Sequence, residues 1–356
     1  MELSCIKLGH YRSAYYSADG KRIVSIGDSN LEGSIVAVWN SDSVRKELEL
    51  EFEGVRRSLE IQVARFVRAG GHIIVLPDES MEYNGGIRVI DLVTGQQLFH
   101  LGRDEGFCEF DLSLNGSTLL AVGRDWNSVR AWNYETGELV LSREVDPGGE
   151  LSAVVAPNGS SFLLATESMR PAVLIDVATG REISNFPEGY WSGAFSPDGE
   201  RILLWSDKVD LWDLKSGAKL CDLGAANFAG FSPGGRYIFT ADFSSSRLKI
   251  WDTTTAEVVH ESYKFRTQQW YAGWERGAPA FSPDGKFLAC CEEQLVNIRV
   301  LETGETVQQF ELPHSVVTSV AFRPFGKQML VTAWTKVHTR SFSGWAPETY
   351  VLDLLF

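Results

Sequence analysis

The stretch AFSPDGERILLWSDKVDLWDLKSGAKL, residues 194–220, decides the fold. It opens with two apolar runs around the turn SPDG, where Gly199 supplies the positive φ that a tight hairpin turn requires. It continues with the alternating run VDLWDLKSG, which ends at Trp212-Asp213 and leads through a turn into another short strand. The stretch therefore predicts four antiparallel strands in succession.

The hairpin phrase recurs along the whole chain. Clear copies are GFSPGGRYIFT from Gly230 and AFSPDGKFLAC from Ala280, and weaker copies begin at Tyr15, Val155 and Ala321. The weakest are FVRAGGHIIVL from Phe66 and DLSLNGSTLLA from Asp111. The turn glycines are Gly20, Gly71, Gly116, Gly159, Gly199, Gly235, Gly285 and Gly326. Their separations of 36 to 51 residues are typical of propeller blades.

The strand phrase recurs with the same spacing. Copies with tryptophan are LKIWDTTTA from Leu248, VRAWNYETG from Val129 and VAVWNSDSV from Val36. IRVIDLVTG from Ile87 and AVLIDVATG from Ala172 keep the alternation without tryptophan. The chain is therefore a repeat protein built from one four-stranded unit.

These phrases resemble the WD-repeat family, and the resemblance covers nearly the whole chain. It lies in the Trp-Asp pairs at Trp212 and Trp251, the Trp-Asn pairs at Trp39 and Trp132, and the Gly9-His10 dipeptide. LPHSVVTSVAFRP, with His314 ahead of its strand, is similar to the family's opening phrase. The resemblance implies an all-β fold, a single β-propeller domain over residues 1–356, of a divergent bacterial type. Most units lack the family's histidine, so we expect its buried hydrogen-bond network to be incomplete.

The number of turn glycines predicts eight four-stranded antiparallel blades, or seven if the second or third unit is not a true blade. The last unit stops at TYVLDLLF, which has the pattern of a third strand. The N-terminal ELSCIKL is a strand with no unit of its own. We expect it to complete the last blade and so close the ring without an open edge.

Composition excludes several classes of function. The formal charge is −14, from 33 basic and 47 acidic residues, which disfavours nucleic acid and anionic membranes as partners. The N-terminus has no signal-peptide pattern and no run of 18 apolar residues occurs. The five cysteines are odd in number and show no two-residue spacing, so we expect thiols in a cytoplasmic protein. Cys290 and Cys291 are strand neighbours on opposite faces and poorly placed to hold one metal.

No motif in the chain indicates catalysis. The six histidines do not have zinc-site spacing, and no nucleophile elbow, phosphate-binding loop or calcium loop is present. We therefore expect no enzyme activity, metal or cofactor. The alternative is a hydrolase or lyase with a site assembled at the channel mouth.

The tryptophans outside the repeat indicate where function lies. We expect Trp39, Trp132, Trp212 and Trp251 to pack between sheets, whereas other aromatics concentrate in two overlong segments, from His260 and from Ala333. Aromatic and arginine side chains are typical of interface hot spots. The predicted binding residues are Tyr263, Arg266, Trp270, Tyr271, Trp274, Trp334, Arg340, Phe342 and Trp345. Two alternatives stay open, namely that these segments plug the channel or are flexible insertions.

Acidic residues gather in the first two units. Asp28, Glu32, Asp78, Glu79 and Glu82 fall in the corresponding loops, and KELELEFEG from Lys46 adds four more acids. These acids suit a polar, oriented partner, or they are simply solvated loops. The chain as a whole favours a cytoplasmic, monomeric scaffold for protein–protein interaction, or a protein that binds and blocks one target. The partner is expected to be a protein.

Overall fold

The computed structural model of the chain is built from β-strands, and its described residues contain no helix. The described residues are 5–29, 33–53, 59–67, 71–79, 85–146, 148–167, 170–242, 244–262, 279–292, 294–338 and 343–356. Their strands form eight four-stranded antiparallel sheets, which we call blades and number in chain order. The β-propeller fold with eight blades is thus confirmed, and the alternative of seven is wrong. By its contacts the chain divides into two compact units, Met1–His100 with Ser262–Phe356, and Leu101–Glu261. The expectation of a single domain stays a prediction.

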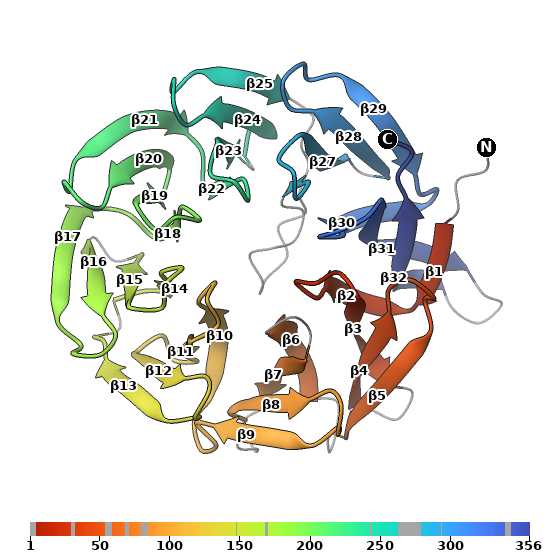
Figure 1. Ribbon diagram of the computed structural model, residues 1–356, viewed down its shortest axis with the longest axis horizontal. Coiled ribbons are helices and arrows are strands. Elements are labelled where there is room, and N and C mark those ends of the chain that lie inside the picture. Colours follow the sequence, from red (N-terminus) through yellow and green to blue (C-terminus); the bar gives the residue numbers. More distant parts are fainter. Residues whose placement is uncertain are drawn as a thin grey trace. The chain divides into compact units, whose positions relative to one another are not determined.

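The first unit holds blades 1, 2, 7 and 8 (Figure 1). Blade 1 consists of β2 (Tyr11–Tyr16), β3 (Arg22–Ser29), β4 (Gly33–Asn40) and β5 (Lys46–Glu53). Blade 2 consists of β6 (Leu59–Val67), β7 (His72–Glu79), β8 (Ile87–Asp91) and β9 (Gln97–Leu101). Blade 7 consists of β26 (Ala280–Phe281), β27 (Phe287–Glu292), β28 (Leu295–Val300) and β29 (Thr306–Glu311). Blade 8 consists of β30 (Ser315–Phe322), β31 (Gln328–His338), β32 (Ser343–Asp353) and β1 (Cys5–Gly9).

The second unit holds blades 3 to 6. Blade 3 consists of β10 (Phe107–Leu112), β11 (Thr118–Gly123), β12 (Ser128–Asn133) and β13 (Leu139–Glu144). Blade 4 consists of β14 (Leu151–Val155), β15 (Ser161–Thr166), β16 (Pro171–Asp176) and β17 (Glu182–Glu188). Blade 5 consists of β18 (Ser192–Phe195), β19 (Arg201–Trp205), β20 (Lys208–Asp213) and β21 (Lys219–Ala225). Blade 6 consists of β22 (Phe228–Phe231), β23 (Tyr237–Asp242), β24 (Arg247–Asp252) and β25 (Val258–Ser262).

Blade 8 is completed by the N-terminal strand, as the sequence predicted. β1 pairs antiparallel with β32, with Cys5 opposite Leu352 and Lys7 opposite Tyr350. Figure 1 shows the two strands side by side at opposite ends of the colour scale. The pairing covers the edge that β32 would otherwise expose.

The repeated Ser-Pro-Asp-Gly turn is stabilised by its own side chains. Ser196 Oγ donates to Asp198 Oδ1 at 2.5 Å and accepts from the backbone N–H of Arg201 at 2.9 Å, across the turn. Gly199 takes a φ of +72°. Seven of the eight predicted turn glycines have positive φ. Gly71 directly follows a segment outside the described residues, so its conformation stays a prediction.

The tryptophans that end the third strands pack within and between sheets. Trp39 contacts Tyr11 edge-on at 5.7 Å, Trp132 contacts Phe107 at 5.6 Å, and Trp212 contacts Phe186 at 5.6 Å. Trp39 shares a core cluster with Leu330 and Val351 of blade 8. Three of the four tryptophans are buried and Trp251 is half-buried, so their predicted structural role is confirmed.

The hydrogen-bond network behind these tryptophans is incomplete, as expected. Trp39 Nε1 donates to Ser25 Oγ at 2.8 Å, and Trp251 Nε1 donates to Thr240 Oγ1 at 2.9 Å. In both blades the acceptor lies two residues after the residue that pairs with the tryptophan. At that position blade 5 has Leu204 and blade 3 has Ala121, neither of which has a hydroxyl group. Only some blades therefore keep a hydroxyl acceptor for the indole.

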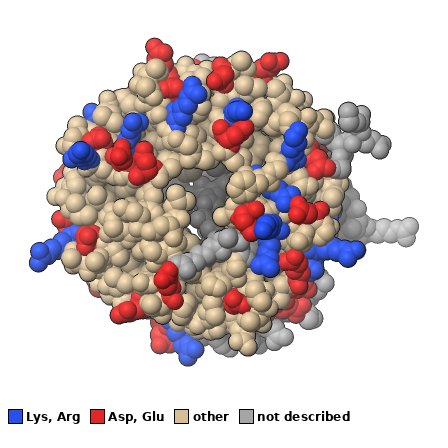
Figure 2. All heavy atoms as spheres, in the orientation of Figure 1, with Lys and Arg blue, Asp and Glu red and all other residues tan. Residues whose placement is uncertain are grey.

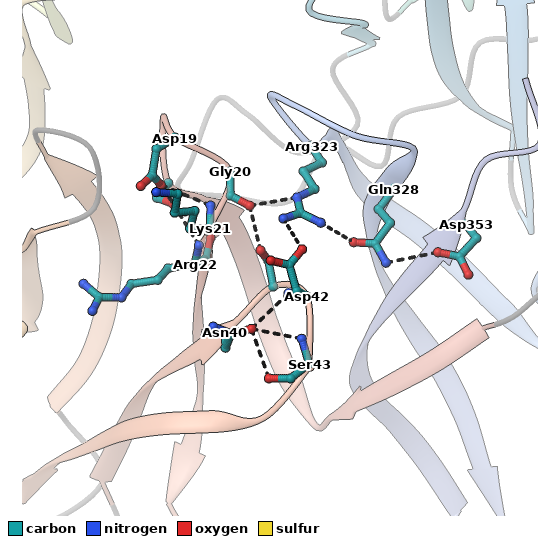
Figure 3. A network of polar contacts seen from close by, with 12 residues as sticks. Asp19, Gly20, Lys21, Arg22, Asn40, Asp42, Ser43, Arg323, Gln328 and Asp353 are labelled. Carbon is teal, nitrogen blue, oxygen red and sulfur yellow. Dashed lines mark hydrogen bonds and ion pairs between the residues drawn. The ribbon is translucent and has the colours of Figure 1, made fainter.

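A polar network joins blade 8 to blade 1 at the end where Gly20 turns (Figure 3). Arg323, just after β30, donates to Gly20 O at 2.8 Å and Asp42 Oδ1 at 2.6 Å. It also donates to Gln328 Oε1 at 3.0 Å. The planar guanidinium satisfies three acceptors on two blades, which fixes how blades 8 and 1 meet.

We predict that Ser25→Ala lowers the free energy of unfolding by about 1–3 kcal/mol, because it leaves the buried Trp39 N–H without its acceptor. Urea unfolding followed by tryptophan fluorescence measures the change. In a Trp39→Phe background the same substitution should cost clearly less. An equal cost in both backgrounds would contradict the assignment.

Candidate functional site

The segment expected to be a long loop in blade 8 is mostly a β-hairpin. β31 and β32 stay paired as far as His338 opposite Ser343. The two neighbouring strands end sooner. β30 pairs with β31 only as far as Thr335, and β1 pairs with β32 only as far as Thr349. The loop prediction for this segment is thus wrong in its larger part, since β-branched and aromatic residues support strand pairing there. We call residues 336–338 and 343–348, which extend past both neighbouring strands, the hairpin arm.

The β31–β32 hairpin places two predicted binding residues on one face, Trp345 on the arm and Trp334 at its base. Trp334 lies opposite Pro347, and Lys336 lies opposite Trp345. Because opposite residues, and residues two apart, share a face of a sheet, all four side chains project from the same side. We call this set the tryptophan face. The two tryptophans are diagonal neighbours, roughly 7–8 Å apart at the backbone.

The tryptophan face is accessible. The Trp345 side chain is 50% exposed, Lys336 is exposed, and Trp334 and Pro347 are half-buried. Unlike Trp39, Trp132 and Trp212, neither Trp334 nor Trp345 stacks on an aromatic ring of the described chain. The exposed half of Trp345 and the exposed part of Trp334 are therefore available for contact.

The opposite face of the arm is anchored by a buried carboxylate. Glu348 accepts a hydrogen bond from Thr335 Oγ1 at 3.0 Å, and further bonds from Tyr350 OH and Lys7 Nζ. His10 Nδ1 lies 4.0 Å from Glu348 Oε1. Burial raises the pKa of Glu348, but the bonds from Lys7, Tyr350 and Thr335 outweigh burial and hold that pKa below its ordinary value. Lys7 belongs to β1, so the closing strand also fixes the base of the arm.

The two faces of blade 8 meet different neighbours. Thr349, two residues after Pro347, donates through Oγ1 to the carbonyl of Tyr11 at 3.1 Å, so the tryptophan face is on the side of blade 1. Tyr350 packs against the cluster that contains Phe310 of blade 7. The anchor and the tryptophan face are thus on opposite sides of one sheet.

Most of the predicted binding residues fall on chain that the structure does not describe. Tyr263, Arg266, Trp270, Tyr271, Trp274, Arg340 and Phe342 lie outside the described residues. Whether the segment from His260 binds a partner or plugs the channel stays a prediction. Sequence reasoning missed Lys336 and Pro347, although their alternation with Trp334 and Trp345 was a signal that two strands extend this far.

The predicted acidic loops are tested only in part. The side chains of Asp28, Asp78 and Glu79 are not described, and Glu32 and Glu82 lie outside the described residues. Residues 46–53 of this stretch form β5, the outer strand of blade 1, so placing its acids with the loops was wrong. Glu47 there pairs with Arg22, and Glu49 pairs with Lys46.

A second buried carboxylate lies in blade 5 of the second unit. Asp210 is fully buried, accepts from Tyr190 OH at 2.5 Å and lies 2.6 Å from Lys219 Nζ. Burial raises the pKa of Asp210, but Lys219 and Tyr190 outweigh it and leave the pKa low. Tyr190 in turn packs edge-on against Trp212. The carboxylate is occupied in positioning Tyr190 and does not reach a surface where a substrate could meet it.

Other kinds of site find little support in the described chain. The described residues contain no cluster of three metal-ligating side chains and no helix that could cross a membrane. On the face drawn in Figure 2, basic side chains of the described residues are interspersed with acidic ones. That face has no continuous basic surface of the kind that phosphate backbones require.

Comparison with known proteins identifies the fold. No family profile and no curated protein sequence matches the chain. The structure is similar to the crystal structure of the C-terminal WD40 domain of Sif2, with a TM-score of 0.72 over 98% of both chains at 13% identity. The chain has the fold of a WD40 propeller. The resemblance stated from the sequence is thereby confirmed at the level of the fold.

We predict that Glu348→Gln lowers the free energy of unfolding at pH 7 by about 1–3 kcal/mol, because it removes the charge that three donors hold. Lys7 is partly in solvent, which favours the lower end of that range. Since the pKa of Glu348 is lower in the folded state, its contribution is present above the ordinary glutamate pKa. It is lost as pH falls through the folded-state pKa.

Urea unfolding of both proteins at a series of pH values tests this. The difference should shrink as pH falls below the ordinary glutamate value. Glu305→Gln, which removes the same charge from an exposed turn, is the control and should change stability little. A difference that does not depend on pH would show that Glu348 is not held as a carboxylate.

Proposed function

We propose that the chain is a non-catalytic scaffold for protein–protein interaction, or a protein that binds and blocks one target, and that the tryptophan face is a main contact. The fold is one that commonly mediates protein interactions. The observation that carries the proposal is Trp345, half exposed on an arm that extends beyond its blade.

Several properties of the arm suit this function. Tryptophan is among the residues that contribute most to binding energy at interfaces. The arm is also preorganised, because the Glu348 anchor fixes its base before any partner arrives. A rigid binding element loses less conformational entropy on association than a mobile loop does.

We further propose that the protein acts in the cytoplasm and is a monomer when alone. The five cysteines are thiols, which suits a reducing compartment. Burial raises the pKa of Cys108 to about 12, which makes this thiol unreactive.

Pull-down from the native cell with purified chain tests the proposed function. We expect a stoichiometric protein partner to be retained by the wild type. Trp334→Ala with Trp345→Ala should reduce its recovery at least about tenfold, since truncating a hot-spot residue typically costs more than 1–2 kcal/mol. Trp191→Ala, which removes a tryptophan 36% exposed in blade 5, is the matched control and should retain the partner.

Circular dichroism and thermal unfolding establish that all three proteins are folded. Equal recovery by the double variant and the wild type would contradict the assignment of the tryptophan face. Loss of folding in the double variant would mean that these side chains serve the structure instead.

A further inference from the structure

The arm offers a partner two ways to bind, by its edge or by its face. β1 pairs with β32 only as far as Gly9, which lies opposite Thr349. The part of β32 before Thr349 has no neighbouring strand on that side among the described residues, so an extended peptide could pair with it. Pro347 lies in that stretch and has no N–H to donate. Because Pro347 is paired with Trp334, its nitrogen is expected to face the open edge, where proline is tolerated in strands. The edge is therefore poorly suited to strand addition, and the face is the better binding surface.

The charge of the tryptophan face differs from that of the whole chain. Lys336 is exposed opposite Trp345, and no acidic side chain of the described residues lies within ion-pair distance of its ammonium group. The one carboxylate in the described part of the arm, Glu348, is on the opposite face and is paired with Lys7. The described part of this face is thus apolar and positive in a chain whose net charge is −14.

The spacing of the two tryptophans limits the shape of the ligand. Diagonal neighbours on paired strands are roughly 7–8 Å apart, which is about the distance between residues i and i+2 of an extended chain. Two apolar side chains on the same side of an extended segment would therefore each meet one indole. An acidic residue beside them would meet Lys336.

We infer that the tryptophan face binds an extended acidic segment of another protein, with two apolar residues two positions apart and flanked by Asp or Glu. This inference rests on the proposed function, and it adds the chemical class of the partner. Lys336 selects for acidic neighbours, and Trp334 and Trp345 supply the contact area. Affinity should therefore fall with added salt, since an exposed ion pair is screened.

The probe is a fluorescein-labelled peptide, GDDLDFDDG, and its counterpart with every Asp replaced by Asn. Fluorescence anisotropy is measured at low and at high NaCl concentration. We expect the acidic peptide to bind at least about fivefold more tightly than the Asn peptide at low salt, with the preference reduced at high salt. Trp345→Ala should weaken binding of both peptides.

Lys336→Glu should abolish the preference for the acidic peptide. Lys327→Glu makes the same charge change at an exposed lysine after the Arg323 turn, at the other end of blade 8, and should leave the preference unchanged. Thermal unfolding of both variants confirms that they are folded.

Three results of the binding measurements would overturn the inference. They are equal binding of both peptides, no binding of either, or an unchanged preference in Lys336→Glu. Sedimentation that shows a dimer abolished by Trp345→Ala would also overturn it, because a second copy would then occupy the face. If the inference fails while the native pull-down still depends on Trp334 and Trp345, the proposed function stands with a different partner. If that dependence is also absent, the proposed function fails too.

Discussion

The pairing of β1 with β32 is the interaction on which blade 8 depends. Without β1, β32 would be an unprotected edge strand, and Glu348 would lose the ammonium group that compensates its burial. The same blade is held to blade 1 by Arg323 at one end and by the bond from Thr349 to the Tyr11 carbonyl nearer the arm. β1 and β32 are thus fixed by a β-ladder, an ion pair with a buried carboxylate and two inter-blade contacts, all within the first unit.

The hairpin arm shows how a repeat fold gains an individual feature. Elsewhere the repeat uses its large aromatics for packing, as Trp39 and Trp212 do against Tyr11 and Phe186. In blade 8, two strands continue past their neighbours and expose Trp345 on the continued part, with Trp334 half-buried at its base. On one face of these strands, Glu348 accepts a hydrogen bond from Thr335 and anchors the hairpin. The opposite face is left accessible to a partner. A long pair of strands therefore provides both rigidity and exposure.

Much of the fold could be predicted from the sequence because its signals are local. The bonds among Ser196, Asp198 and Arg201 lie within one turn, so the clear copies of the turn share one local residue pattern. The closing role of β1 was predictable because the last unit stops at its third strand and the N-terminal strand has no unit of its own. The contact of Lys7 with Glu348 was not, since 341 residues separate the two. The hairpin in place of a loop was also missed, because how far two strands stay paired depends on contacts between them that no local phrase records.

Closure by the N-terminal strand has a consequence for how the protein is made. β1 leaves the ribosome before β32, and at about 5–20 residues per second roughly 20–70 seconds separate the two strands. During that time β1 has no partner from its own chain, and contacts of such long separation form slowly. The arm's anchor requires both β1 and β32, so a chain whose synthesis stops before β32 carries no anchored arm. The proposed binding surface is thereby restricted to chains in which both strands have been made.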